Sequence, residues 1–225
     1  RNGGRAFSQQ QFLRTEKHSG RALLLTESSR APNPVHEGYD RIMLERYLVE
    51  YCASTLAGLK TASLFSYTGE EKELVLDYLS YWNQILNPRG VYLELLHSNS
   101  ARELIYVYRA SALTADLNRP EAIHFLNEYG YPMGSLSDCL NYLRQRIALT
   151  QSFPHEIGLF LGYPIEDVAE FIKNQGRNCK YCGIWKVYHN EIEAKRLFAK
   201  IDKCRAIYTK LFCGGRSVLQ LTVAA

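Results

Sequence analysis

The segment Cys179-Lys180-Tyr181-Cys182 carries the clearest chemical motif in the sequence, a pair of cysteines separated by two residues. A tetrahedral zinc site needs four ligands, and this pair supplies two of them. The sequence holds no second CxxC motif and no HxxxH motif, so His189 and Cys204 are the nearby residues that could complete such a site. The pair is therefore half of a candidate metal site.

A redox role is the second interpretation of the same pair. In thioredoxin-like proteins the first cysteine opens a helix, whose dipole favours the thiolate that thiol chemistry needs. Here the pair follows a predicted helix end and leads into a predicted strand, so that help is absent. Arg177, Lys180 and Lys186 could supply positive charge instead. Cys179 and Cys182 are thus metal or redox candidates, and two unreactive thiols are the alternative.

Sixteen tyrosines, several of them on predicted strands, suggest a second kind of site. Their rings could line a cleft for a flat cofactor, with Lys60, Arg109 and Lys186 as contacts for its anionic groups. Tyrosine is also a favoured strand residue, so we prefer ordinary packing as the explanation. The sequence lacks the P-loop, GxGxxG, GxSxG and HExxH motifs, and the cofactor stays unknown. The strand tyrosines are Tyr67, Tyr92, Tyr106, Tyr108 and Tyr188.

His155 and Glu156 lie in the first turn of a predicted helix, after Phe153-Pro154. In a functional interpretation they contact a ligand, and His155 serves as a metal ligand or as a general acid or base near neutral pH. In the structural interpretation, which we prefer, His155 is bonded locally at the start of the helix. Both residues remain ligand-binding candidates.

Residues 153–174 have the spacing of a DNA-reading helix-turn-helix, with Gly158 and Val168 where the helices touch and Gly162 in the turn. The front of the second helix should meet phosphates and base edges, yet it carries Glu166-Asp167, whose carboxylates would face outward toward the phosphate charge. We therefore predict a helical corner used for packing and disfavour nucleic acid as a partner.

The bulk numbers describe an ordinary globular protein of 225 residues, 46% hydrophobic and 22% charged. Of the net charge of +4, residues 1–38 carry +3, so the body is nearly neutral and has no bulk attraction for a phosphate backbone. No apolar run approaches the roughly 20 residues that span a bilayer, so we expect a cytoplasmic protein without a membrane partner. Helical spacing predicts that Cys52, Cys139 and Cys204 are core residues.

Residues 1–38 are predicted to form a flexible tail, and residues 39–225 a single α+β domain. Its expected fold is a mixed β-sheet with flanking helices and a helical insertion near 110–175 that contains the corner. The segments 64–96 and 184–223 both follow a strand-helix-strand pattern, a weak sign of an internal repeat. The apolar spacing predicts helices over 42–56, 68–86, 120–129, 136–149, 153–161, 164–174 and 191–212, and strands over 63–67, 91–97, 103–109, 184–188 and 219–223, with a hairpin whose second strand is central.

Several stretches resemble domain-of-unknown-function family 3793, a bacterial family found mainly in anaerobes. The resemblance covers about residues 39–225. The resemblance assigns no role to any residue. It implies an association with flavodoxin and iron-uptake genes, which favours a role in redox or iron handling. The stretches are Leu56-Ala57-Gly58-Leu59-Lys60, Tyr106-Val107-Tyr108-Arg109, the run from Phe153 to Pro164, Trp185-Lys186-Val187-Tyr188 and Leu221-Thr222-Val223-Ala224.

These observations lead to a first hypothesis, a small-ligand, cofactor or metal-binding accessory protein of anaerobic redox or iron metabolism. Its partner would be a small ligand or a redox partner protein, and whether it is an enzyme stays open. A nucleic-acid-binding regulator using residues 153–174 and a non-catalytic interaction module are the alternatives. The ligand-binding candidates are Lys60, Arg109, His155, Glu156 and Lys186, and the metal or redox candidates are Cys179 and Cys182.

Overall fold

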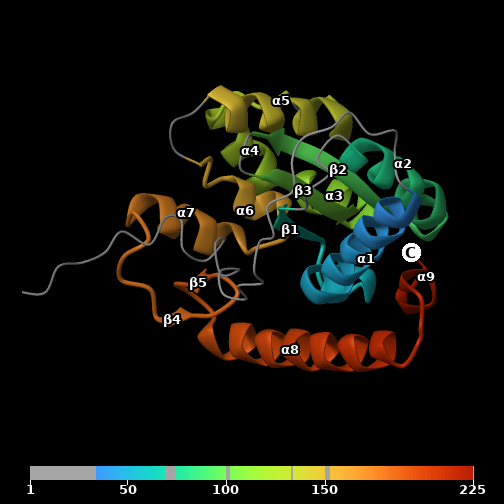
Figure 1. Ribbon diagram of the computed structural model, residues 1–225. Helices are drawn as coiled ribbons and strands as arrows, with labels where there is room; N and C mark the ends of the chain where they lie inside the picture. Colours follow the sequence, from blue (N-terminus) through green and yellow to red (C-terminus); the bar gives the residue numbers. More distant parts are fainter. Residues whose placement is uncertain (1–33, 69–73, 100–101, 133, 150–152, 225) are drawn as a thin grey trace, which may run out of the picture.

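The computed structural model describes residues 34–68, 74–99, 102–132, 134–149 and 153–224, with side chains from Leu44 onward (Figure 1). Helix α1 spans Pro34–Leu56, so the predicted boundary at residue 38 falls inside this helix. The rest of the predicted tail, residues 1–33, lies outside the described residues. Its flexibility and the single-domain organisation remain predictions.

A three-stranded sheet forms the centre of the fold, with β1 (Ala62–Tyr67), β3 (Glu103–Arg109) and β2 (Val91–Ser98) side by side in that order. Both pairings are antiparallel, so the prediction of a mixed sheet was wrong, although the α+β class is confirmed. The reason is that the hairpin strand β3 inserts between β1 and β2, which therefore never pair with each other. All seven residues of β3 are buried, as expected of a central strand.

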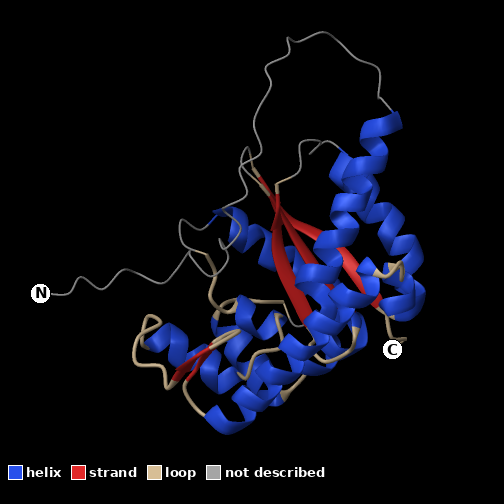
Figure 2. Cartoon of the chain, turned by 60° about the horizontal axis from the view of Figure 1, so that its bottom comes forward, coloured by secondary structure: helices blue, strands red, loops and turns tan. Residues whose placement is uncertain are grey.

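Helices cover both faces of the sheet (Figures 1 and 2). Alternate residues of β3 point to opposite sides, so each face of this strand contributes to a separate core. Ile105 and Val107 face a core formed with α1, α2 (Val75–Leu86) and α9 (Val218–Leu221). Tyr106 faces a second core that holds the helical insertion. A short 3-10 helix, η2 (Asn87–Arg89), follows α2, and the insertion consists of α3 (Ala110–Leu117), α4 (Pro120–Glu128), α5 (Leu136–Leu149), α6 (Ile157–Phe160) and α7 (Ile165–Lys173).

The C-terminal part differs most from the prediction. The expected strand 219–223 is wrong, since this segment forms α9. Ser217 starts that helix with a capping box, in which its hydroxyl accepts from the Gln220 amide and its own amide donates to the Gln220 side chain. The expected strand 184–188 shortens to β5 (Lys186–Val187), which pairs with β4 (Tyr181–Cys182) in a separate hairpin. The internal repeat is therefore absent from these segments.

The long helix α8 (Glu191–Cys213) follows the β4–β5 hairpin and packs along α1 (Figure 1). Its buried residues, Ala194, Phe198, Ile201 and Cys204, recur at three and four residues, as the predicted stripe requires. Cys52, Cys139 and Cys204 are buried, which confirms their prediction as core residues. Among the described residues, no helix combines the length and apolar character needed to cross a bilayer.

Candidate functional site

The two cysteines of the CxxC motif lie in the β4–β5 hairpin, just after α7. The chain turns sharply between them and α7, because Gln175, Gly176 and Asn178 all have positive φ angles, of 51°, 72° and 60°. The Lys180 amide then donates to the Val187 carbonyl at 2.8 Å, which begins the hairpin. The pair therefore follows the end of α7 and leads into β4, so neither cysteine opens a helix, as the sequence predicted.

Asp167 fixes the hairpin to the first turn of α7. Its carboxylate is 3% exposed and accepts hydrogen bonds from the Trp185 indole at 2.8 Å, the Tyr188 amide at 2.8 Å and the His189 amide at 3.0 Å. We expected the acids of this turn to face outward; Glu166 is exposed, but for Asp167 the expectation was wrong. The carboxylate turns inward because the hairpin offers it three N–H donors.

Aromatic packing holds the other side of the hairpin. The Trp185 ring stacks on Tyr163 at a centroid distance of 4.9 Å and meets Phe198 of α8 edge-on at 4.5 Å. Gly183 lies so close to Phe198 that a Cβ atom would overlap its ring. The hairpin is thus fastened to α7 and to α8, and it presents its thiols from a fixed frame.

The exposure of the six thiols sets this pair apart. Cys182 is exposed and Cys179 is half-buried, and the structure contains no disulfide between them. Burial raises the pKa of the Cys52 thiol to about 12 and also raises the pKa values of Cys139 and Cys204. Cys213 is exposed but stands alone at the end of α8. The pair in the hairpin is where two accessible thiols occur close together.

Tyr188, directly after β5, has a buried hydroxyl without a hydrogen-bond partner among the described residues. The residue is 6% exposed, and its hydroxyl oxygen has no hydrogen-bond partner within the described part of the chain. Burial raises its pKa to about 12, and charges on Cys179, Glu170, Asp167 and Cys182 add to this shift. A buried hydroxyl without an acceptor is costly, and a thiolate would be such an acceptor.

The predicted metal site gains no further ligands. Cys204 is buried between helices, with its sulfur 3.6 Å from the Ala53 carbonyl of α1. His189 is exposed after β5. Within the described ranges, no three His, Cys, Asp or Glu side chains gather where they could hold a metal ion. The CxxC pair therefore supplies two thiolates, and any further ligands would have to be brought to it.

Two of the ligand-binding candidates lie near the hairpin. The Lys186 ammonium donates to the Gly176 carbonyl and lies 5.8 Å from the centre of the Phe171 ring. The His155 ring meets the same Phe171 ring edge-on at 5.0 Å, and burial lowers the pKa of this histidine, with Glu156 acting against the shift. The fold thus brings His155 and Lys186 to one aromatic ring at the base of the hairpin.

The other candidates make internal contacts. Glu156 is 2% exposed and pairs with Arg146. Arg109 donates to the carbonyls of Thr55, Leu56 and Val223, so it braces the end of α1 to the C-terminal segment. Ligand contacts by these residues remain predictions.

Lys60 is linked to the hairpin through the Tyr163 ring. Its ammonium lies 5.0 Å from the centre of the Tyr163 ring, which itself stacks on Trp185. Burial lowers the pKa of the Lys60 amine to about 8; Cys52 acts against this shift and Arg205 adds to it. A bound anion would stabilise this half-buried ammonium. Among the described residues, no carboxylate forms an ion pair with it.

The strand tyrosines do not share a cleft. Tyr67 belongs to the core beneath α1 and α2, whereas Tyr106 and Tyr108 stack at 5.1 Å on the opposite face of the sheet. The Tyr108 hydroxyl donates to Glu94 at 2.6 Å. Tyr188 lies apart in the hairpin. These rings pack as ordinary strand residues, which is the explanation that we preferred.

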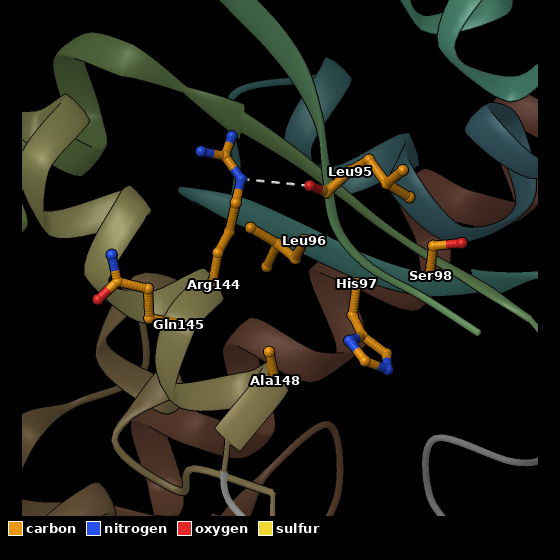
Figure 3. A pocket seen from close by; sticks show the side chains of 7 residues that line it. All are labelled: Leu95, Leu96, His97, Ser98, Arg144, Gln145 and Ala148. Carbon is orange, nitrogen blue, oxygen red and sulfur yellow. Dashed lines mark hydrogen bonds between the residues drawn. The ribbon is translucent and has the colours of Figure 1, made fainter.

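An open hollow of about 390 Å³ lies between the edge strand β2 and α5 (Figure 3). Arg144 crosses it and donates to the Leu95 carbonyl at 3.2 Å, and it also pairs with Glu94. The sequence did not predict this hollow, because it forms where a bulge between Leu95 and His97 shifts the register of β2. Its lining residues are Leu95, Leu96, His97, Ser98, Arg144, Gln145 and Ala148.

The geometry defines an α+β protein that presents an anchored dithiol hairpin beside its main sheet. Residues 48–222 match the family described as "Protein of unknown function (DUF3793)", so the chain belongs to this family and the predicted resemblance is confirmed. No curated protein and no solved structure matches the chain. The matched range includes both the sheet and the CxxC hairpin.

Proposed function

We propose that this protein is an accessory protein of redox metabolism whose Cys179–Cys182 pair undergoes thiol–disulfide exchange with a disulfide-bearing partner. The observation that carries the proposal is the pairing of an exposed thiol with a half-buried one in a hairpin that Asp167 and Trp185 hold in place. A fixed pair favours ring closure to a disulfide, because little further ordering is needed when the second thiol attacks.

The exposure of the thiols gives the order of attack. The Cys182 thiolate attacks one sulfur of the partner disulfide, whose S–S bond breaks, and a mixed disulfide and one partner thiolate result. The Cys179 thiolate then attacks the Cys182 sulfur, and the second partner thiolate leaves. Two electrons pass to the partner, which ends as a dithiol after taking the two protons that Cys179 and Cys182 released. The protein ends with a Cys179–Cys182 disulfide.

Tyr188 supports the second step. Its hydroxyl is buried without a partner among the described residues. After burial itself, Cys179 is the first charged group that raises its pKa, so we propose that it donates a hydrogen bond to the Cys179 thiolate. The hydrogen bond would hold Cys179 ready to resolve the mixed disulfide. The buried hydroxyl gains the acceptor that the reduced hairpin lacks.

The other hypotheses use different features of the chain. A packing role for the corner is supported by Asp167, which anchors the hairpin, and by Gly158, whose missing Cβ leaves room for Val168. A nucleic-acid-binding regulator or a plain interaction module would leave the thiol pair unreactive. Zinc or iron binding would make the pair a ligand set, and elemental analysis of protein purified without oxygen would detect the metal.

Trapping the mixed disulfide tests the proposal. A Cys179→Ser variant cannot resolve the intermediate, so a mixed disulfide with glutathione should accumulate at Cys182 and be visible by mass spectrometry. The reduced wild type should instead pass through this adduct to an intramolecular disulfide. Cys213, an exposed lone thiol, is the internal control for accessibility alone. If Cys182 reacts no faster than Cys213 and the wild type forms no disulfide, the pair is not an exchange site.

A further inference from the structure

The hairpin that carries the thiols is surrounded by cations. Between residues 171 and 190 the sequence contains no Asp or Glu, whereas it contains Lys173, Arg177, Lys180 and Lys186. Lys180 and Arg177 are exposed, and Lys180 stands between the two cysteines in the chain. Lys186 lies directly across the hairpin from Cys182, its partner in the strand register.

The carboxylates on the flanking helices are mostly engaged elsewhere. Asp167 is buried and accepts three N–H groups of the hairpin. Glu170 pairs with Lys173 at 3.0 Å, and Glu191 pairs with Lys195 at 2.6 Å. Glu193 likewise pairs with Arg196 at 2.5 Å, while Glu166 is exposed at the start of α7. Asp167 therefore places one negative charge at the hairpin and Glu170 pairs with Lys173, so Arg177, Lys180 and Lys186 leave a net positive charge there.

The cations neighbour the more accessible sulfur along the chain and across the hairpin. Cys182 is exposed in β4, Lys180 precedes it by two residues, and Lys186 of β5 is its register partner. The Lys180 and Lys186 ammonium groups donate to the carbonyls of His189 and Gly176, which are uncharged. Outside residues 171–190, the range 39–225 carries a net charge of −3, because the whole range carries +1 and residues 171–190 contribute +4. A local cluster on such a body concentrates anions at one point and not over the whole surface.

We infer that the exchange site selects disulfides that carry carboxylates, which the cluster Arg177, Lys180 and Lys186 would draw to Cys182. This inference rests on the proposed exchange function and adds the chemical class of its substrate. The carboxylates of the incoming disulfide would lie against the cations while the Cys182 thiolate attacks the S–S bond. Because the cations are mostly exposed, the preference should be strong at low ionic strength and weak in high salt.

The test measures attack by Cys182 alone, in a Cys179→Ser/Cys213→Ser background. Mixed-disulfide formation is followed by mass spectrometry with glutathione disulfide, which is anionic, and with cystamine, which is cationic. A second pair consists of disulfide-linked peptides with glutamates or lysines beside the cysteine, and it stands for a protein partner. Every rate is divided by the rate of 2-mercaptoethanol with the same disulfide, which removes the intrinsic reactivity of each compound.

We expect the anionic member of at least one pair to react about tenfold faster than its cationic counterpart at low salt. The Arg177→Gln/Lys180→Gln variant should lose this preference. The matched control Arg216→Gln/Lys210→Gln removes the same charges at the far end of α8 and should keep it (Figure 1). A preference within the pair of glutathione disulfide and cystamine identifies a small-molecule substrate. A preference within the peptide pair identifies a protein substrate.

Two outcomes would overturn the inference, and they differ in what they say of the proposed function. If Cys182 reacts with every disulfide at charge-independent relative rates, the substrate class is wrong and the exchange function stands. If Cys182 reacts with none of them, the exchange function itself is wrong. A preference that survives in the Arg177→Gln/Lys180→Gln variant would also contradict the role of this cluster.

Discussion

At the scale of single residues, Asp167 anchors β5, the strand that pairs with the thiol-bearing strand β4. One buried carboxylate accepts from the Trp185 indole and from the amides of Tyr188 and His189, and so joins the start of α7 to the far strand of the hairpin. The same carboxylate was expected to face outward, since sequence spacing places it beside Glu166 in a first helical turn. Its orientation follows from donors that are about twenty residues away along the chain, which no local pattern reveals.

Replacing Asp167 should therefore destabilise the protein. Asp167→Ala leaves three N–H donors, two of them buried, without an acceptor, and we expect a loss of about 2 to 4 kcal/mol in the free energy of unfolding. Urea titration followed by circular dichroism measures the change. The matched control Glu166→Ala, one residue earlier and exposed, should stay within about 0.5 kcal/mol of the wild type. Equal effects of the two substitutions would contradict the anchoring role.

Lys60 gives a prediction on pH. Its pKa of about 8 in the folded protein lies below the value of about 10.4 in an unfolded chain. The unfolded chain therefore binds more protons between these values, and the contribution of Lys60 to stability rises with pH through this window. Below pH 8 the folded protein must hold a poorly solvated ammonium.

Lys60→Met removes that group and tests the prediction. The variant should be more stable than the wild type by about 1 to 2 kcal/mol near pH 7, after allowance for solvent screening. The advantage should shrink as pH rises from 8 to 10, because the wild-type amine loses its proton. Urea titrations at several pH values measure it. An advantage that does not change with pH would show that packing, and not charge, separates the two proteins.

At the scale of elements, apolar spacing predicted two helices closely, whereas the long helix α1 begins at Pro34 and not at residue 42. The predicted helix 191–212 and the predicted helix 136–149 match α8 and α5 closely. The strand expected at 219–223 failed because its alternating residues are equally compatible with one helical turn, and the capping box at Ser217 decides for the helix. The helix expected over 153–161 shortened to the four residues of α6.

The candidate site was predictable in its chemistry but not in its geometry. The sequence shows the CxxC spacing and its neighbouring cations, and these identify Cys179 and Cys182 as metal or redox candidates. The buried Tyr188 hydroxyl and the Asp167 anchor are tertiary features, since they depend on how α7, α8 and the hairpin pack. The hairpin itself was missed because β4 and β5 have only two residues each, too few for an alternating pattern.

The hairpin also provides a test at this scale. Gly183→Ala would drive a methyl group into the Phe198 ring and push the turn away from α8, and we expect a cost of about 1 to 3 kcal/mol. Thermal unfolding measures the stability, and the rate of Cys182 alkylation reports the position of the turn. Gly134→Ala is the control, because its new methyl group would meet only an ordinary contact with Asp138 at 3.6 Å. Unchanged stability of the Gly183 variant would show that the turn is loosely packed.

At the scale of the whole molecule, two layers of helices enclose an antiparallel sheet, and the thiol hairpin lies outside this sandwich against α7 and α8 (Figures 1 and 2). The hairpin has a small core of its own, formed by Trp185, Val187, Ala194 and Phe198. A thiol pair on such an appendage can react with a large partner without disturbing the main cores. The fold thus separates stability, which the sheet provides, from the chemistry that we propose for the hairpin.

The most direct measurement of the central claim is the redox state of Cys179 and Cys182 at equilibrium. Reduced wild-type protein is incubated in glutathione buffers of increasing oxidation, quenched by alkylation and analysed by mass spectrometry of the peptide that contains both residues. We predict one reversible two-electron transition to a Cys179–Cys182 disulfide, with Cys52, Cys139 and Cys204 alkylated only after unfolding. The opposite result is that Cys179 and Cys182 form no disulfide at any ratio of oxidised to reduced glutathione. Each thiol would then carry only its own glutathione adduct, as expected for the lone Cys213, and the proposed exchange function would be wrong.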